Sequence, residues 1–202
     1  STFHCEGGTT FDSNRASERG GAFYVTRHSS VLWDPCSSTG NKASLGASFY
    51  ASHAKIELLS GSILAYGEVG TGAMVYGLDS DLEANGASFL SKGVPAVIAV
   101  QMNEGGTIKA FGCQFSGWQG PQVVLTEGAL EMDSCDFRGS PANLLVSAND
   151  PATPARIRNT ALGEAMYAGL ASEDVESFGE NVETCADDPC GTTEAFVASA
   201  TD

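Results

Sequence analysis

The chain repeats itself at an interval of about 26 residues, and this period restricts the possible folds more than any other feature. Apolar residues recur in short alternating runs, and helical spacing is poor, so each repeat is expected to supply short β-strands. Three rows of apolar residues share the 26-residue step: Phe23, Phe49 and Val75; Leu32, Leu58, Ala84 and Ala110; and Ile63, Phe89 and Phe115.

The interval between equivalent residues becomes shorter later in the chain, but the repeat continues. It is shortest from Phe115 to Phe137, and it lengthens again from Met132 to Ile157 without regaining its first value. Successive repeats of this kind stack as units of supersecondary structure, so equivalent positions come to lie above one another. We therefore expect Phe89, Phe115 and Phe137 to form an inward ladder.

Two repeat architectures have periods in this range. A leucine-rich repeat needs several leucines at fixed positions and a ladder of asparagines, and the chain has neither. A β-helix needs about three short strands per coil, inward apolar residues and small turn residues, all of which are present. With 202 residues, enough for one domain, we expect an all-β parallel β-helix, a solenoid, of about six coils over residues 1–163.

The rhythm stops near residue 164. Residues 164–202 are acidic and rich in small residues, so we expect an irregular C-terminal tail that lies along the rod or reaches a partner. A partly disordered terminus is the alternative. One or two helical turns are expected at 165–171, in the first part of this segment.

Two short motifs carry a resemblance to a known group of proteins. Phe11–Asn14 (FDSN) is followed by Gly20–Phe23 (GGAF), and this pair resembles the repeats of polymorphic outer-membrane and autotransporter β-helices, within the pectate-lyase-like group. The resemblance implies a right-handed coil and an extracytoplasmic location. It implies no particular chemistry, because this fold carries lyases, adhesins and structural stalks.

The charge balance excludes several classes of partner. The chain has ten Lys and Arg and 25 Asp and Glu, which gives a formal net charge of -15. Nucleic acids and anionic membranes require a basic surface on the protein that binds them.

No apolar run reaches the roughly 18 residues that cross a bilayer. The acidic surface suits a basic partner or cations, or it serves solubility alone. The chain shows no signal peptide and does not begin with Met, so we expect a mature form or a piece of a longer protein.

Six cysteines suggest disulfides and an oxidising compartment, because the spacing and the scattered histidines do not match a zinc site. Cys113 and Cys135 each precede a ladder phenylalanine by two positions, so they should share one position in neighbouring coils. Neighbouring strands lie about 4.8 Å apart, within the Cα range of a disulfide. We therefore expect a Cys113–Cys135 bond, with a pair of reduced, buried thiols as the alternative.

The remaining cysteines give two further predicted bonds. Cys185 and Cys190 bracket a short acidic segment that contains a proline, and they should close a tight exposed loop within the tail. Cys5 and Cys36 do not share a position in the repeat, and they are paired only by elimination.

One polar constellation follows the 26-residue step. Arg27, His53 and Asp79 share one position in three successive repeats, so stacking would bring them together on an outer face. An arginine, a histidine and an aspartate could hold a carboxylated sugar and move a proton. The alternative, which we favour, is an outward polar ladder whose opposite charges neutralise one another.

Other candidate sites are aromatic or acidic. Trp33, Trp118 and the isolated Phe196 of the tail are candidate binding residues, as stacking platforms or interface anchors, although half-buried packing is the ordinary role of such tryptophans. Alternating acids at 79–83 suggest calcium, but they match no known calcium loop and a solvated face explains them better. The sequence therefore predicts no metal site and no cofactor.

These observations favour a binding or scaffolding protein over an enzyme. The chain lacks a nucleophile elbow, a phosphate-binding glycine loop and paired metal ligands. We expect a non-enzymatic subunit or segment of a larger extracytoplasmic protein assembly, secreted, at the cell surface or in an oxidising lumen. The alternatives are a carbohydrate-active enzyme, a polyuronate lyase or hydrolase, that uses Arg27, His53 and Asp79, and a carbohydrate-binding adhesin fragment.

Overall fold

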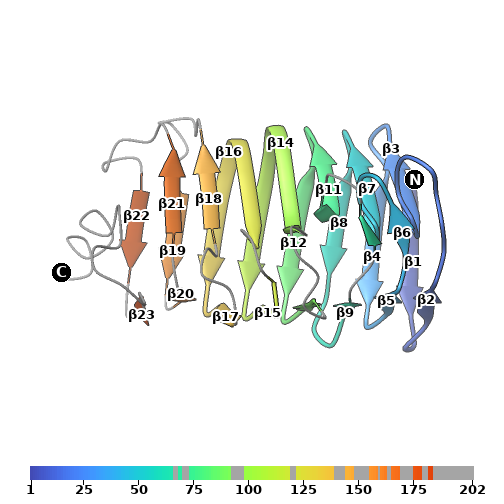
Figure 1. The fold of residues 1–202 in the computed structure, drawn as a ribbon, viewed down its shortest axis with the longest axis horizontal. Helices are drawn as coiled ribbons and strands as arrows, with labels where there is room; N and C mark the ends of the chain where they lie inside the picture. Colours follow the sequence, from blue (N-terminus) through green and yellow to red (C-terminus); the bar gives the residue numbers. More distant parts are fainter. Residues whose placement is uncertain are drawn as a thin grey trace.

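The computed structural model shows a rod of parallel strands, a β-solenoid of about five turns (Figure 1). It describes residues 1–65, 68–69, 73–91, 98–118, 122–138, 144–147, 155–158, 160–162, 165–168, 175–178 and 182–183. No helix occurs in these segments, so none of them contains a helix that could cross a bilayer. The predicted all-β parallel solenoid is confirmed.

The largest sheet forms two adjacent rows of strands, and two long strands belong to both rows because they span the corner between them. The long strands are β14 (Ile98–Phe111) and β16 (Val123–Asp133). The first row also holds β3 (Phe23–Thr26), β7 (Phe49–Ser52), β11 (Ala73–Leu78), β18 (Leu144–Ser147) and β21 (Ala165–Ala168). The second also holds β1 (Thr2–Glu6), β4 (Ser30–Asp34), β8 (Lys55–Leu58), β12 (Asp81–Asn85), β19 (Ala155–Arg158) and β22 (Val175–Phe178).

Shorter strands complete each turn. An eight-stranded sheet runs along the rod, and a separate two-stranded sheet is also present. The eight strands are β2 (Thr10–Asp12), β5 (Ser37–Thr39), β9 (Ile63–Ala65), β13 (Ser88–Leu90), β15 (Gln114–Ser116), β17 (Asp136–Arg138), β20 (Ala161–Leu162) and β23 (Val182–Glu183). The two-stranded sheet pairs β6 (Lys42–Ala43) with β10 (Glu68–Val69).

The core is a column of inward side chains, as period-two alternation along stacked strands requires. Phe89, Phe115 and Phe137 lie in register, with ring centroids 4.7 and 4.6 Å apart and nearly parallel planes. The predicted inward ladder is therefore confirmed. Phe11 begins the same row at the N-terminal end, where it contacts Trp33.

Two rows contain a one-residue shift that the sequence did not reveal. Trp33, not Leu32, lies opposite Leu58, and Leu64, not Ile63, lies opposite Phe89. The coil at these points is shorter than the common step by a single residue, and such a shift moves a side chain to the other face of a strand. Trp33 and Leu64 are consequently buried, whereas Ile63 is exposed.

Parallel pairing continues beyond residue 163. Strand β21 pairs with β18, β22 pairs with β19, and β23 pairs with β20. The helical turn predicted at 165–171 is wrong, because Ala165–Ala168 forms a strand whose partners supply the backbone hydrogen bonds that a helix would otherwise make internally. Residues 184–202, including the predicted Cys185–Cys190 loop and Phe196, lie outside the described residues.

The Cys5–Cys36 bond is present, with its Cα atoms 6.3 Å apart. Cys5 lies on β1 opposite Trp33, and Cys36 follows β4 at the next corner. The bond therefore joins the first strand to the coil that stacks on it. This pairing is confirmed, although the repeat gave no geometric reason to expect it.

Cys113 and Cys135 occupy neighbouring positions, as predicted, but they are free thiols, so the predicted disulfide between them is wrong. Both thiols are buried, and each lies 3.3 Å from a backbone carbonyl oxygen, of Ala84 and Ala110 respectively, to which it donates. Each thiol is thus accommodated as a small buried group that contacts the backbone of the preceding coil. The neighbouring Cys113 side chain, together with burial, raises the pKa of the Cys135 thiol.

Candidate functional site

Arg27, His53 and Asp79 form a column at one corner of the rod. The backbone N–H of each donates to the next coil, to the carbonyls of Ser52, Leu78 and Asn103. All three residues adopt a left-handed backbone conformation, with φ of 55°, 52° and 42°, which turns the chain between the two rows of the large sheet. The three residues therefore share one corner, as predicted, and all are exposed, but within the described part of the chain only the side chains of His53 and Asp79 contact each other.

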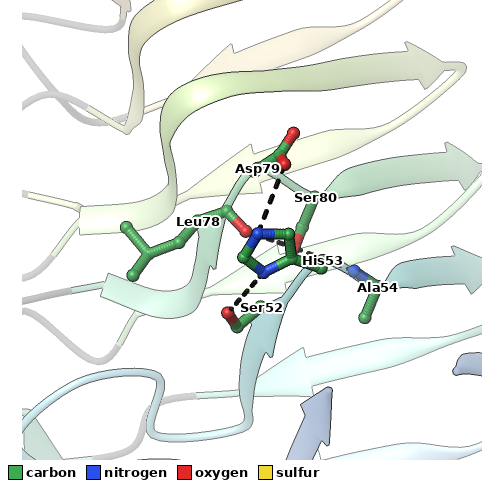
Figure 2. Close-up of polar contacts among 6 residues, drawn as sticks. All are labelled: Ser52, His53, Ala54, Leu78, Asp79 and Ser80. Carbon is green, nitrogen blue, oxygen red and sulfur yellow. Dashed lines mark hydrogen bonds and ion pairs between the residues drawn. The ribbon is translucent and has the colours of Figure 1, made fainter. Parts of the chain in front are cut away.

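The imidazole of His53 contacts a side chain on each of its nitrogens (Figure 2). Its Nε2 lies 3.5 Å from Oδ2 of Asp79, and its Nδ1 lies 3.1 Å from Oγ of Ser52. In the neutral tautomer with the proton on Nε2, His53 donates to Asp79 and accepts from the Ser52 hydroxyl. This order of contacts is the one that activates a serine hydroxyl in hydrolases.

The surroundings of His53 are exposed to solvent. The side chains of His53 and Asp79 are each 58 % exposed. They line an open depression of about 330 Å³ together with Ser29, Ser30 and Lys55. Water screens the interaction of charges at such a surface, so the pair contributes little energy. Chemically, the corner can bind an anion or a hydroxyl group, but its walls do not exclude water from a reacting bond.

The column continues with two acids that the sequence did not place in it. Residues Glu104 and Glu127 are exposed and have φ of 60° and 57°. Asn103 pairs with Leu78 and with Thr126, which puts the two glutamates at the same corner as Asp79. The available signal was the repeat interval, but the steps to Glu104 and Glu127 are shorter than those before them, which concealed it.

A second group of charges surrounds Lys55 on the neighbouring row. Its Nζ lies 3.0 Å from Glu83 and 3.3 Å from Glu57. The hydrogen bond to Glu83 is the main reason why the pKa of Lys55 is raised, and the same contact lowers the pKa of the Glu83 carboxyl. Asp79 stands apart at its corner, so the acids at 79–83 do not form one face. Among the described residues, no three His, Cys, Asp or Glu side chains are placed to hold a metal ion.

Two of the candidate binding aromatics are not at the surface. Trp33 and Trp118 are fully buried, so the expectation that they act as platforms or anchors for a ligand is wrong for the described surface. Trp118 donates its indole N–H to the Phe89 carbonyl oxygen at 3.1 Å, and Trp33 packs among the N-terminal phenylalanines.

An outer tyrosine ladder is the aromatic feature that sequence reasoning missed. Tyr24, Tyr50 and Tyr76 stack on the outside of β3, β7 and β11, with centroids 5.1 and 5.7 Å apart. The guanidinium of Arg19 lies 5.0 Å from the centre of the Tyr50 ring. The 26-residue step was the available signal, because each tyrosine directly follows a member of the inward row that begins with Phe23.

Comparison of the chain with protein-family models, with curated proteins and with solved structures finds no match.

Proposed function

We propose that this protein is a non-enzymatic binding or scaffolding module, one part of a larger extracytoplasmic protein assembly. The observation that carries the proposal is the N-terminal end of the rod. Among the described residues, strands β1, β2 and β3 each pair with one neighbour, and no described strand pairs with their other edges (Figure 1). Open parallel edges are templates for pairing with another chain.

Aromatic side chains make this end apolar as well as open. Phe3 is 43 % exposed, and it contacts Phe11 and Phe23 at centroid distances of 6.4 and 5.1 Å. Phe11 and Phe23 in turn pack onto the buried Trp33, so the hydrophobic core continues to the surface of the end. Exposed apolar surface combined with backbone donors and acceptors supports further strands that add to the stack, supplied by more of the same chain or by a protein partner.

The disulfide supports the same proposal. An end coil lacks a neighbour on one side, and the Cys5–Cys36 bond compensates by tying β1 to the following coil. Such a bond persists in oxidising compartments, which supports an extracytoplasmic location. A pre-formed end also lowers the ordering cost of binding.

The test is capture of a partner by the full chain from extracts of the organism that encodes it. Wild-type protein should retain a stoichiometric partner, identified by mass spectrometry. Phe3→Glu should lose it, because a charge would then lie in the contact, whereas Ile63→Glu, equally exposed on the flank, should retain it. Absence of a stoichiometric partner, or retention by both variants, would contradict the proposal.

A carbohydrate-active enzyme is the second candidate, and the Ser52–His53–Asp79 contacts favour it. In this reading, His53 moves a proton and Arg27 binds the carboxylate of a polyuronate. The purified protein should then release sugar ends from pectin or alginate, and His53→Ala should abolish the release. Under the scaffolding proposal neither protein has activity. A carbohydrate-binding adhesin would bind these polymers without cleaving them.

A further inference from the structure

The outer tyrosine ladder and Arg19 form a second feature of the N-terminal coils, distinct from the open end and from the His53 corner. Arg19 lies against the face of Tyr50, and the neighbouring Tyr24 side chain is the main reason why the pKa of Arg19 is raised. The stacked ring of Tyr50 is only 1 % exposed, while Tyr24 beside it is 55 % exposed. The guanidinium therefore lies beside one buried aromatic ring and one accessible aromatic ring.

Arg19 has no ion-pair partner among the described residues, although the nearby Glu18 carboxylate contributes to the raised pKa of its guanidinium. Within the part of the chain that the structure describes, no carboxylate lies at ion-pair distance from it, in contrast to Lys55 and Arg138, which contact Glu83 and Asp136. The chain has 25 acidic residues for ten basic ones, so neutralising partners are abundant. A guanidinium has five N–H donors suited to a bidentate carboxylate, and the Tyr24 contact leaves most of them free.

The N-terminal segment that carries this site is close to neutral, although the whole chain is strongly acidic. Residues 1–55 carry five Lys or Arg and four Asp or Glu, whereas residues 56–202 carry five and 21. Arg15 and Arg27 flank Arg19 along the chain, are exposed, and also have no described carboxylate at ion-pair distance. Repulsion from the distant acids is screened over about 8 Å at physiological ionic strength.

The shape indicates the size of the ligand group. The depression beside Arg19 and Tyr24 measures about 280 Å³, is open to solvent, and is lined otherwise by Ala16, Ser17 and Glu18. Sites for small molecules are usually enclosed and larger. An open depression of this size accommodates one side chain of an extended segment, with the rest of the segment lying along the surface.

We infer that Arg19 and Tyr24 form an anchoring site for an acidic peptide segment of a protein partner. A carboxylate of the segment binds the guanidinium, and a neighbouring side chain packs on the Tyr24 ring. This inference rests on the proposed function, and it names the chemistry of the partner at a surface separate from the strand edges.

The probe is a phage-displayed library of random dodecapeptides selected on the immobilised full chain. Selected peptides should be enriched in Asp and Glu over the starting library. The most enriched peptide should lose affinity at least about tenfold with Arg19→Gln or Tyr24→Ala, as expected for loss of a charge-assisted contact. Arg138→Gln, an exposed arginine already paired with Asp136, is the matched control and should bind within about twofold of wild type.

Three results would overturn the inference: no acidic enrichment, unchanged affinity in both site variants, or binding of polygalacturonate at Arg19 in place of the peptides. Thermal melting of each variant shows whether it is folded, and the two site variants act independently of each other. Because peptides replace the natural partner, this test can fail while partner capture through the strand edges succeeds, and the reverse also holds.

Discussion

Phe11 and Phe115 lie in the same inward row, one at the N-terminal end of the rod and the other in its middle. Phe115 is stacked between two phenylalanines and is fully buried. Phe11 is only partly buried, and its neighbours are Phe3, Phe23 and Trp33. The backbone coil is equivalent in both places, so the difference lies in the number of coils that cover each ring. A middle coil is stabilised by stacking on both sides, whereas the end coil has one neighbour and a disulfide.

The largest effect is expected when a core ring is removed from the middle of the rod. Phe115→Ala should lower the free energy of unfolding by about 3–5 kcal/mol, because it leaves a cavity between two stacked rings. Phe11→Ala should cost about 1–2 kcal/mol, since part of that ring is already in water. Urea denaturation of both variants measures the difference. Equal losses would show that the end coil is as closely packed as the middle.

The next largest effect is expected when the disulfide of the end coil is removed. Replacing Cys5 and Cys36 by alanine should lower the free energy of unfolding by about 3–4 kcal/mol, from the chain entropy of a loop of this length. Hydrogen exchange should accelerate in β1 and remain slow in β15. Cys113→Ala, which removes a free thiol, is the control and should cost much less. Uniform acceleration along the whole rod would contradict a local role for the bond.

Two glycines at corners of the rod extend the comparison between the early coils and the middle coils. Gly46 and Gly112 have nearly the same φ, 64° and 60°, but an added Cβ would overlap the Phe49 carbonyl oxygen at Gly46 and meet nothing within 4 Å at Gly112. Gly46→Ala should therefore cost about 3 kcal/mol, since overlap adds to the left-handed strain, and Gly112→Ala about 1 kcal/mol. Thermal unfolding of the two variants provides the test. Equal costs would indicate that the early corners are not crowded.

The smallest effect is electrostatic. Lys55→Gln should lower the free energy of unfolding by about 0.5 kcal/mol near neutral pH, because the pair is partly exposed and screened. The folded-state pKa of Glu83 is lowered, so its contribution is present above its unfolded pKa and is lost as the pH falls through the folded value. The raised pKa of Lys55 makes its contribution disappear at alkaline pH.

Wild type and Lys55→Gln should therefore differ from about pH 5 to pH 10 and converge on both sides of that range. Denaturation midpoints measured across this range provide the test. A difference that persists at pH 3 would point to lost packing of the lysine stem as its cause, with no role for the ion pair.

The period in the sequence predicted the solenoid, the Phe89–Phe115–Phe137 ladder and the Arg27–His53–Asp79 column. It did not predict where a coil loses a single residue, so Trp33 was placed near the surface and Ile63 in the core. Both errors have one cause, because side chains alternate between faces and a single residue exchanges them. Period alone carries no information on such shifts.

The site was predicted less completely than the fold. The apolar pattern gives the positions of inward residues only, because outward positions accept many residue types. It therefore did not predict the outward Glu104, Glu127 and tyrosine ladder. Arg19 lies in the first coil, before any repeat can be compared with an earlier one. Its position over Tyr50 depends on two coils meeting, which is tertiary information.

Strands β21 to β23 show where weak periodicity misleads. Ala165–Ala168 contains alanine and methionine, which suit a helix locally. Pairing with β18 makes this segment a strand, because the preceding coil provides a row of unpaired backbone groups. Tertiary context therefore overrides local propensity at the end of a stack.

Hydrogen exchange of the chain bound to its captured partner tests the central proposal most directly. If the protein is a scaffold that binds through its N-terminal end, amides of Thr2–Glu6, Thr10–Asp12 and Phe23–Thr26 should become protected on binding, and those of Gln114–Ser116 should not change. Protection confined to the corner of Ser52, His53 and Asp79, with none in β1 to β3, would contradict the proposal.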